Sequence, residues 1–70
     1  MTAYELANSL VKDAISKPAV KIPVDIEKFN GLMKFEVISY LQDAATKLGV
    51  GKYIAIAYLG RFTITYTRED

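Results

Sequence analysis

Hydrophobic and polar positions follow a helical period over the first part of the chain. Apolar residues recur three and four positions apart, at Ala3, Leu6, Ala7, Leu10, Val11, Ala14 and Ile15. Thr2 precedes this pattern, and Glu5 lies three residues after Thr2, which is the spacing of a capping box. Pro18 cannot continue a helix, and Lys17 suits the helix C-terminus. The pattern therefore predicts an α-helix over Ala3–Ser16.

Residues 19–26 alternate instead with a period of two, which predicts a half-buried strand. Pro23 has no N–H to donate to a neighbouring strand, so we expect this strand to lie at an edge of the sheet or to be short. Residues 27–31 end in Asn30-Gly31 and predict a turn.

A second helical pattern predicts a helix from about Leu32 to Leu48. Its expected buried face is Val37, Ile38, Leu41, Ala44, Ala45 and Leu48. Gly49 stands where a left-handed C-cap is expected, with Val50 packing back on the last turn.

Residues 52–67 predict a β-hairpin. A three-residue loop of Tyr58, Leu59 and Gly60 places Ile56 opposite Phe62 and Ile54 opposite Ile64. One face of the hairpin is then Ile54, Ile56, Phe62, Ile64 and Tyr66, and the other is Tyr53, Ala55, Ala57, Thr63, Thr65 and Thr67. This loop is favoured because a two-residue loop would mix large apolar and threonine side chains on one face.

These elements predict an α+β fold with a helix, a short edge strand, a second helix and a C-terminal β-hairpin. The strands form a small antiparallel sheet packed on the two helices. Seventy residues leave room for one domain, 1–70, and for one core. The expected shared core is Leu10, Ile38, Leu41, Ile56, Phe62 and Ile64.

Candidate catalytic chemistry is scarce. The sequence has no histidine and no cysteine, which excludes the familiar triads, thiolate sites and zinc sites. Asp25, Glu27 and Asp43 suit turns and exposed surface better than a catalytic carboxylate pair. Gly49-Val50-Gly51-Lys52 lacks the strand before it and the helix after it that a phosphate loop needs. We therefore expect no enzyme, no cofactor and no metal.

Charge and apolar content limit the location and the partners. The net charge of +1 carries no strong signal for nucleic acid, and no signal peptide or membrane span is visible. The lack of cysteine favours the reducing cytoplasm. So small a chain also suits a phage or mobile-element accessory protein.

One motif points to DNA. Residues 45–50, Ala-Thr-Lys-Leu-Gly-Val, resemble the A-x-x-L-G-V core of helix-turn-helix proteins of the small phage Cro type. The resemblance implies that residues 52–59 form a recognition helix in the major groove, with Lys47, Lys52 and Tyr53 as DNA-binding residues. In a winged-helix variant, helix 32–48 reads the DNA and the hairpin is the wing. The alternation of residues 52–59 favours a strand, so the backbone there separates these alternatives.

The hairpin face that carries small, uncharged side chains predicts protein–protein binding as the main function, and DNA binding is the alternative. Its candidate partner-binding residues are Tyr53, Ala55, Ala57, Thr63 and Thr65. A hairpin edge can also accept a strand from a partner. With 51% apolar residues, the chain is predicted to be a small non-catalytic regulatory protein and a homodimer.

Overall fold

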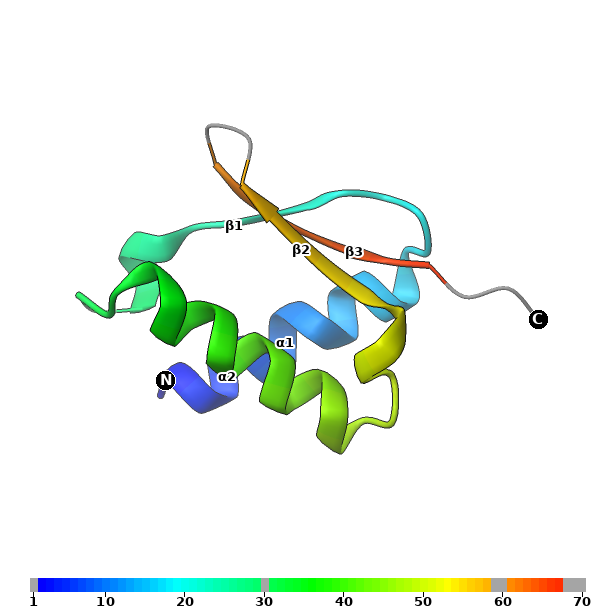
Figure 1. Cartoon of the computed structure of the whole chain (residues 1–70), viewed down its shortest axis with the longest axis horizontal. Helices are drawn as coiled ribbons and strands as arrows, with labels where there is room; N and C mark the ends of the chain where they lie inside the picture. The colour runs from blue at the N-terminus through cyan, green and yellow to red at the C-terminus, as the bar shows by residue number, and fades with distance from the viewer. Residues whose placement is uncertain (1, 30, 59–60, 68–70) are drawn as a thin grey trace.

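The computed structural model of this chain describes residues 2–29, 31–58 and 61–67. The fold is α+β, with two helices on one side of a three-stranded antiparallel sheet (Figure 1). The elements are α1 (Ala3–Ser16), β1 (Ile22–Val24), the 3-10 turn η1 (Ile26–Phe29), α2 (Lys34–Lys47), the 3-10 turn η2 (Gly51–Tyr53), β2 (Ile54–Tyr58) and β3 (Phe62–Tyr66). The predicted fold class is confirmed.

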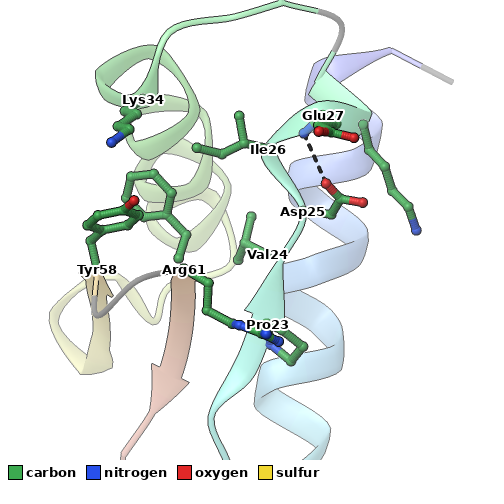
Figure 2. Close-up of a pocket in the computed structure, with 10 residues that line it drawn as sticks. Pro23, Val24, Asp25, Ile26, Glu27, Lys34, Tyr58 and Arg61 are labelled. Carbon is green, nitrogen blue, oxygen red and sulfur yellow. Dashed lines mark hydrogen bonds between the residues drawn. The ribbon is translucent and has the colours of Figure 1, made fainter.

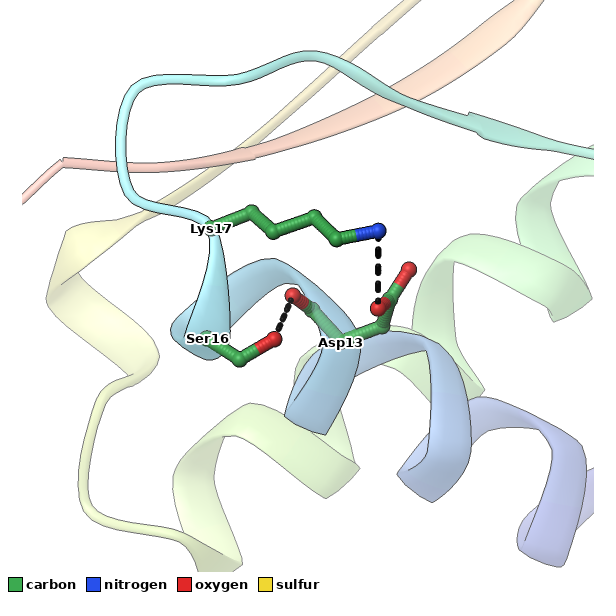
Figure 3. Close-up of polar contacts among 3 residues, drawn as sticks. All are labelled: Asp13, Ser16 and Lys17. Atoms are coloured by element: carbon green, nitrogen blue, oxygen red, sulfur yellow. Dashed lines mark hydrogen bonds and ion pairs between the residues drawn. The ribbon is translucent and has the colours of Figure 1, made fainter.

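Helix α1 has the predicted bounds because local side chains hold both ends. The Thr2 hydroxyl accepts a hydrogen bond from the Glu5 backbone N–H at 3.1 Å, as the N-cap prediction requires. At the other end, the Ser16 hydroxyl donates to the Asp13 carbonyl at 2.7 Å, and Lys17 pairs with the Asp13 carboxylate at 3.6 Å (Figure 3). Both side chains of this ion pair are substantially exposed, so its contribution to stability is small.

Strand β1 is a short edge strand, as predicted, and it occupies only part of the alternating segment 19–26. Ala19 has a left-handed backbone (φ 64°), which delays entry into the sheet. After Val24, the Asp25 carboxylate accepts the Glu27 N–H at 3.0 Å, which begins the 3-10 turn η1. The structure therefore leaves only three residues of this segment in the ladder.

The predicted edge position of Pro23 is confirmed, because the strand order is β1-β3-β2. Pro23 lies opposite Thr63. The Ala19 N–H donates to the Tyr66 carbonyl at 2.7 Å, which shows that Tyr66 directs its carbonyl toward the β1 side of β3. By antiparallel alternation, Ile22 and Val24 direct their backbone groups to β3, and Pro23 directs its nitrogen away from the sheet. The missing N–H therefore costs no ladder bond.

Helix α2 begins two residues later than expected. The Met33 N–H donates to the Glu36 carboxylate at 3.1 Å and closes the first turn. Gly49 adopts the predicted left-handed conformation (φ 76°). Its N–H donates to the Thr46 carbonyl at 3.0 Å, and the Val50 N–H donates to the Ala45 carbonyl at 2.9 Å. These two bonds form a Schellman motif, which ends the helix and buries Val50.

The predicted hairpin register is wrong by two residues. Ile56 lies opposite Ile64 instead of Phe62, and Ile54 lies opposite Tyr66 instead of Ile64. Tyr58, expected in the loop, is the last residue of β2. Leu59 and Gly60, the other two expected loop residues, lie outside the described residues. A shift of two residues keeps every side chain on its face, so the two predicted faces of the strands are preserved.

The core lies between the helices and the inner face of the sheet. Leu41, Phe62 and Ile64 are buried, as predicted. Leu10, Ile38 and Ile56 are only partly buried and pack against this core from its margin. Leu48, predicted on the buried face of the second helix, is exposed, so that prediction is wrong. Small residues let α1 approach α2 and the sheet closely. The buried residues are Ala7, Val11, Ala14, Ile22, Val24, Phe29, Val37, Leu41, Ala44, Ala45, Val50, Phe62, Ile64 and Tyr66.

Candidate binding surfaces

The outer face of the sheet, on the side away from the helices, is one candidate surface. It brings together Ala55 and Ala57 of β2, Thr63 and Thr65 of β3, and Pro23 of β1. The two alanines and Pro23 are exposed, and the two threonines are half-buried. We call these five residues the outer face. None carries a charge, so a partner that covered them would not have to desolvate an ion.

Tyr53, the fifth predicted partner-binding residue, lies apart from the outer face. It belongs to η2, and its ring meets the buried Tyr66 ring edge-on, with centroids 6.2 Å apart. Tyr53 therefore packs against the core side of the sheet. The alternation that assigned Tyr53 to the outer face stops at Ile54, where β2 begins.

The open edge of β2 is a second candidate surface. The Thr67 N–H donates to the Tyr53 carbonyl at 3.0 Å, so residues 53 and 67 form a hydrogen-bonded pair. In an antiparallel ladder such pairs alternate, so Ala55 and Ala57 direct their backbone groups to β3, whereas Ile56 and Tyr58 direct theirs outward. Within the described residues, no strand pairs with this side of β2.

A third surface is a groove of about 610 Å³ at the hairpin end of the molecule (Figure 2). Val24 and Ile26 point into it from the β1 side, toward Tyr58. The Lys34 ammonium lies 4.2 Å from the centroid of the Tyr58 ring, within cation–π range. Arg61 extends along the groove toward Pro23.

The charges around this groove nearly cancel. Three cations line it, Lys28, Lys34 and Arg61, together with the carboxylates of Asp25 and Glu27. Such a mixed lining does not build the concentrated positive potential that phosphate recognition uses.

The recognition helix that the helix-turn-helix resemblance implies is absent. Residues 51–53 form a 3-10 turn and residues 54–58 form β2, and all of these residues are described. Gly49 thus caps a helix that leads into a hairpin. The placement of a recognition helix after Val50 is wrong.

Each of the three residues that this alternative assigns to DNA contacts a tyrosine of the protein itself. Tyr53 meets the Tyr66 ring, as described above. Lys47 donates a hydrogen bond to the Tyr4 hydroxyl, and its ammonium lies 4.3 Å from the centroid of the Tyr4 ring. The Lys52 ammonium lies 5.5 Å from the centroid of the Tyr53 ring. The two lysines therefore engage different tyrosines, on α1 and on η2.

Neither a metal site nor a membrane-spanning helix is found in the described residues. They contain no group of three or more carboxylate, histidine or cysteine side chains that could hold a metal ion. None of their helices is long and apolar enough to cross a membrane. No protein-family model, curated protein or solved structure gives a significant match to this chain.

Proposed function

We propose that this chain is a small non-catalytic protein that acts by binding other proteins, in a regulatory role in the cytoplasm. The observation that carries this proposal is the outer face. Both helices lie on the other side of the sheet (Figure 1). The outer face is uncharged across all three strands. The absence of cysteine fits a reducing compartment.

The chemistry of the outer face suits a flat protein partner. Alanine and threonine side chains are short, so a second sheet or a helix can approach the backbone closely. A low content of charged residues at the centre of a patch is typical of protein–protein interfaces. The exposed Arg61, which extends toward Pro23, is of a residue type that often dominates binding energy (Figure 2).

Site-specific photo-cross-linking in the producing cells tests this proposal. A photoreactive amino acid at Ala57 should yield a cross-linked product with a partner protein. The matched control is the same amino acid at Gln42, which is exposed on α2, away from the sheet's outer face. Equal products from both positions, or none from Ala57, would refute binding through the outer face.

A winged-helix DNA-binding protein is the second candidate. Helix α2 leads into the β2–β3 hairpin, and β1 lies beside β3 instead of β2. This is the order of elements and strands in a winged-helix domain, with η1 in place of the helix that precedes the reading helix. The argument is one of fold, and fold alone does not determine function. The carboxylates that offset the cations of the groove weigh against DNA binding.

A further inference from the structure

We infer that the partner at the open edge of β2 is a second copy of this chain. The two β2 strands pair antiparallel about a two-fold axis, with Ile56 opposite the partner's Ile56. This inference rests on the proposed protein-binding function and names one partner and one pairing geometry for it. The result is a continuous six-stranded sheet in the order β1-β3-β2-β2-β3-β1.

The backbone of β2 fits this register. Ile56 and Tyr58 direct their N–H and carbonyl groups away from β3, as derived from the Thr67–Tyr53 bond and the β2–β3 register. With the two-fold axis at Ile56, each Ile56 exchanges both backbone hydrogen bonds with the partner's Ile56. The Tyr58 N–H of each copy meets the partner's Ile54 carbonyl. The edge is thus complementary to itself, as a two-fold interface requires.

The side chains fit as well. On the helix side, Ile56 meets the partner's Ile56, and Ile54 meets the partner's Tyr58. On the outer side, Ala55 meets the partner's Ala57. Every pair joins uncharged side chains, and none places like charges opposite each other. The pairing also covers Ile54 and Ile56, which are only half-buried in the single chain, whereas the inner side chains of β3 are buried.

The two edges of the sheet differ in how well they are protected against pairing with another strand. The β1 edge is three residues long and carries Pro23, whose nitrogen faces outward without a hydrogen. The β2 edge is five residues long and contains no charge, proline or glycine. Unprotected edges of this kind readily accept another strand. Pairing therefore takes place through β2 and stops at two copies, because the β1 edge does not extend the sheet.

The area that a stable dimer must bury is a modest share of the accessible surface of one chain. A standard interface removes about 800 Å² per partner, which is roughly a sixth of the 4717 Å² accessible surface. Tyr58 is the large exposed side chain at this edge and supplies an aromatic anchor. It sits beside the partner's Ile54 in the inferred register.

Disulfide trapping tests this register directly, because the chain has no cysteine of its own. Ala55 and the partner's Ala57 form a non-hydrogen-bonded pair, with Cα atoms about 4.5 Å apart, within disulfide reach. We would mix Ala55→Cys and Ala57→Cys proteins, one of them isotope-labelled, under mild oxidation. The mixed disulfide should exceed either symmetric disulfide several-fold. Both alanines are exposed, so the substitutions leave the core untouched.

Thr65→Cys is the matched control, since Thr65 lies beside Ala55 on the outer face but on the central strand. Disulfides through Thr65→Cys as abundant as the mixed product would show that two outer faces stack, and would overturn edge pairing. Sedimentation equilibrium of the unmodified protein should rise from 7.8 kDa toward twice that mass with concentration. A monomer at all concentrations would also overturn the inference, while cross-linking from Ala57 to a different protein would still support the proposed function.

Discussion

Tyr58 and Phe62 lie opposite each other across the β2–β3 pair, with ring centroids 5.0 Å apart and ring planes inclined by 53°. The two aromatic residues have different surroundings. Phe62 is 4% exposed and belongs to the core, whereas Tyr58 is 53% exposed and lies beneath the Lys34 ammonium. Phe62 therefore contributes mainly to the stability of the fold, whereas Tyr58 contributes mainly to the chemistry of the surface.

Phe62→Ala should lower the free energy of unfolding by about 3–5 kcal/mol, because it leaves a cavity in the core. Such a loss is a large part of the stability of a small domain. Tyr58→Ala, at the facing position, should cost about 1 kcal/mol or less. Urea unfolding followed by circular dichroism measures both variants. Similar midpoints for the two would show that Phe62 is not a core residue.

Gly49→Ala should destabilise the domain through backbone strain alone. A Cβ at this position meets no atom within 4 Å, so there is no steric clash with neighbours. The left-handed conformation costs an alanine about 1–2 kcal/mol, which corresponds to a fall in Tm of about 4–16 °C. Gly49→Asn should recover part of the loss, since asparagine tolerates this conformation. Equal melting of all three proteins in a calorimeter would contradict the cap.

Ala57→Glu should leave the unfolding free energy of the single chain unchanged within about 0.5 kcal/mol, because the side chain is exposed there. The same change should remove the binding of a protein partner to the outer face, because a covered, unpaired carboxylate is costly. Photo-cross-linking from a neighbouring outer-face position, Thr65, measures this loss. Gln42→Glu on α2 adds the same charge elsewhere and should have no effect. Undiminished cross-linking in Ala57→Glu would exclude this face.

The protein should show no sequence-dependent binding to duplex DNA at physiological salt. The cations at the groove are offset by carboxylates, and residues 51–58 form a 3-10 turn and a strand instead of a recognition helix. Fluorescence anisotropy at about 50 and 200 mM salt tests this, because phosphate contacts weaken steeply over that range. Tight, sequence-dependent binding that Lys34→Ala weakens, and Lys12→Ala on α1 does not, would establish the winged-helix candidate instead.

Elements held together by local signals were predictable from the sequence. The Thr2 cap, the Pro18 stop and the Gly49 turn each depend on residues within a few positions, and the structure confirms all three. Phe29 was missed because the residues around it look like a turn. Its burial comes from the packing of η1 against α2, which no local pattern shows.

The hairpin register was missed for a different reason. Registers that differ by two residues place the same side chains on the same faces, so alternation alone cannot choose between them. The packing of Tyr58 on Phe62 and the pairing of β1 with β3 accompany the observed register. The outer face was predictable from alternation, except at Tyr53. A hairpin edge was expected to accept a partner strand, but which of the two edges stays open was not predictable. That depends on β1, some thirty residues before β2, joining the other side of β3.

The central position of β3 also sets the order in which the protein can fold during synthesis. Of the three strands in the described residues, β3 is the last to leave the ribosome, yet it joins β1 to β2, through pairs such as Ile22 with Ile64. Until Tyr66 has emerged, neither edge strand has a partner and the inner faces of the helices have no sheet to cover them. Contacts between residues so distant in sequence form slowly, because a long loop must close first. The part of the nascent chain that has emerged therefore carries an unpaired edge strand until β3 has also left the ribosome, and this interval is when it is most accessible to chaperones and proteases.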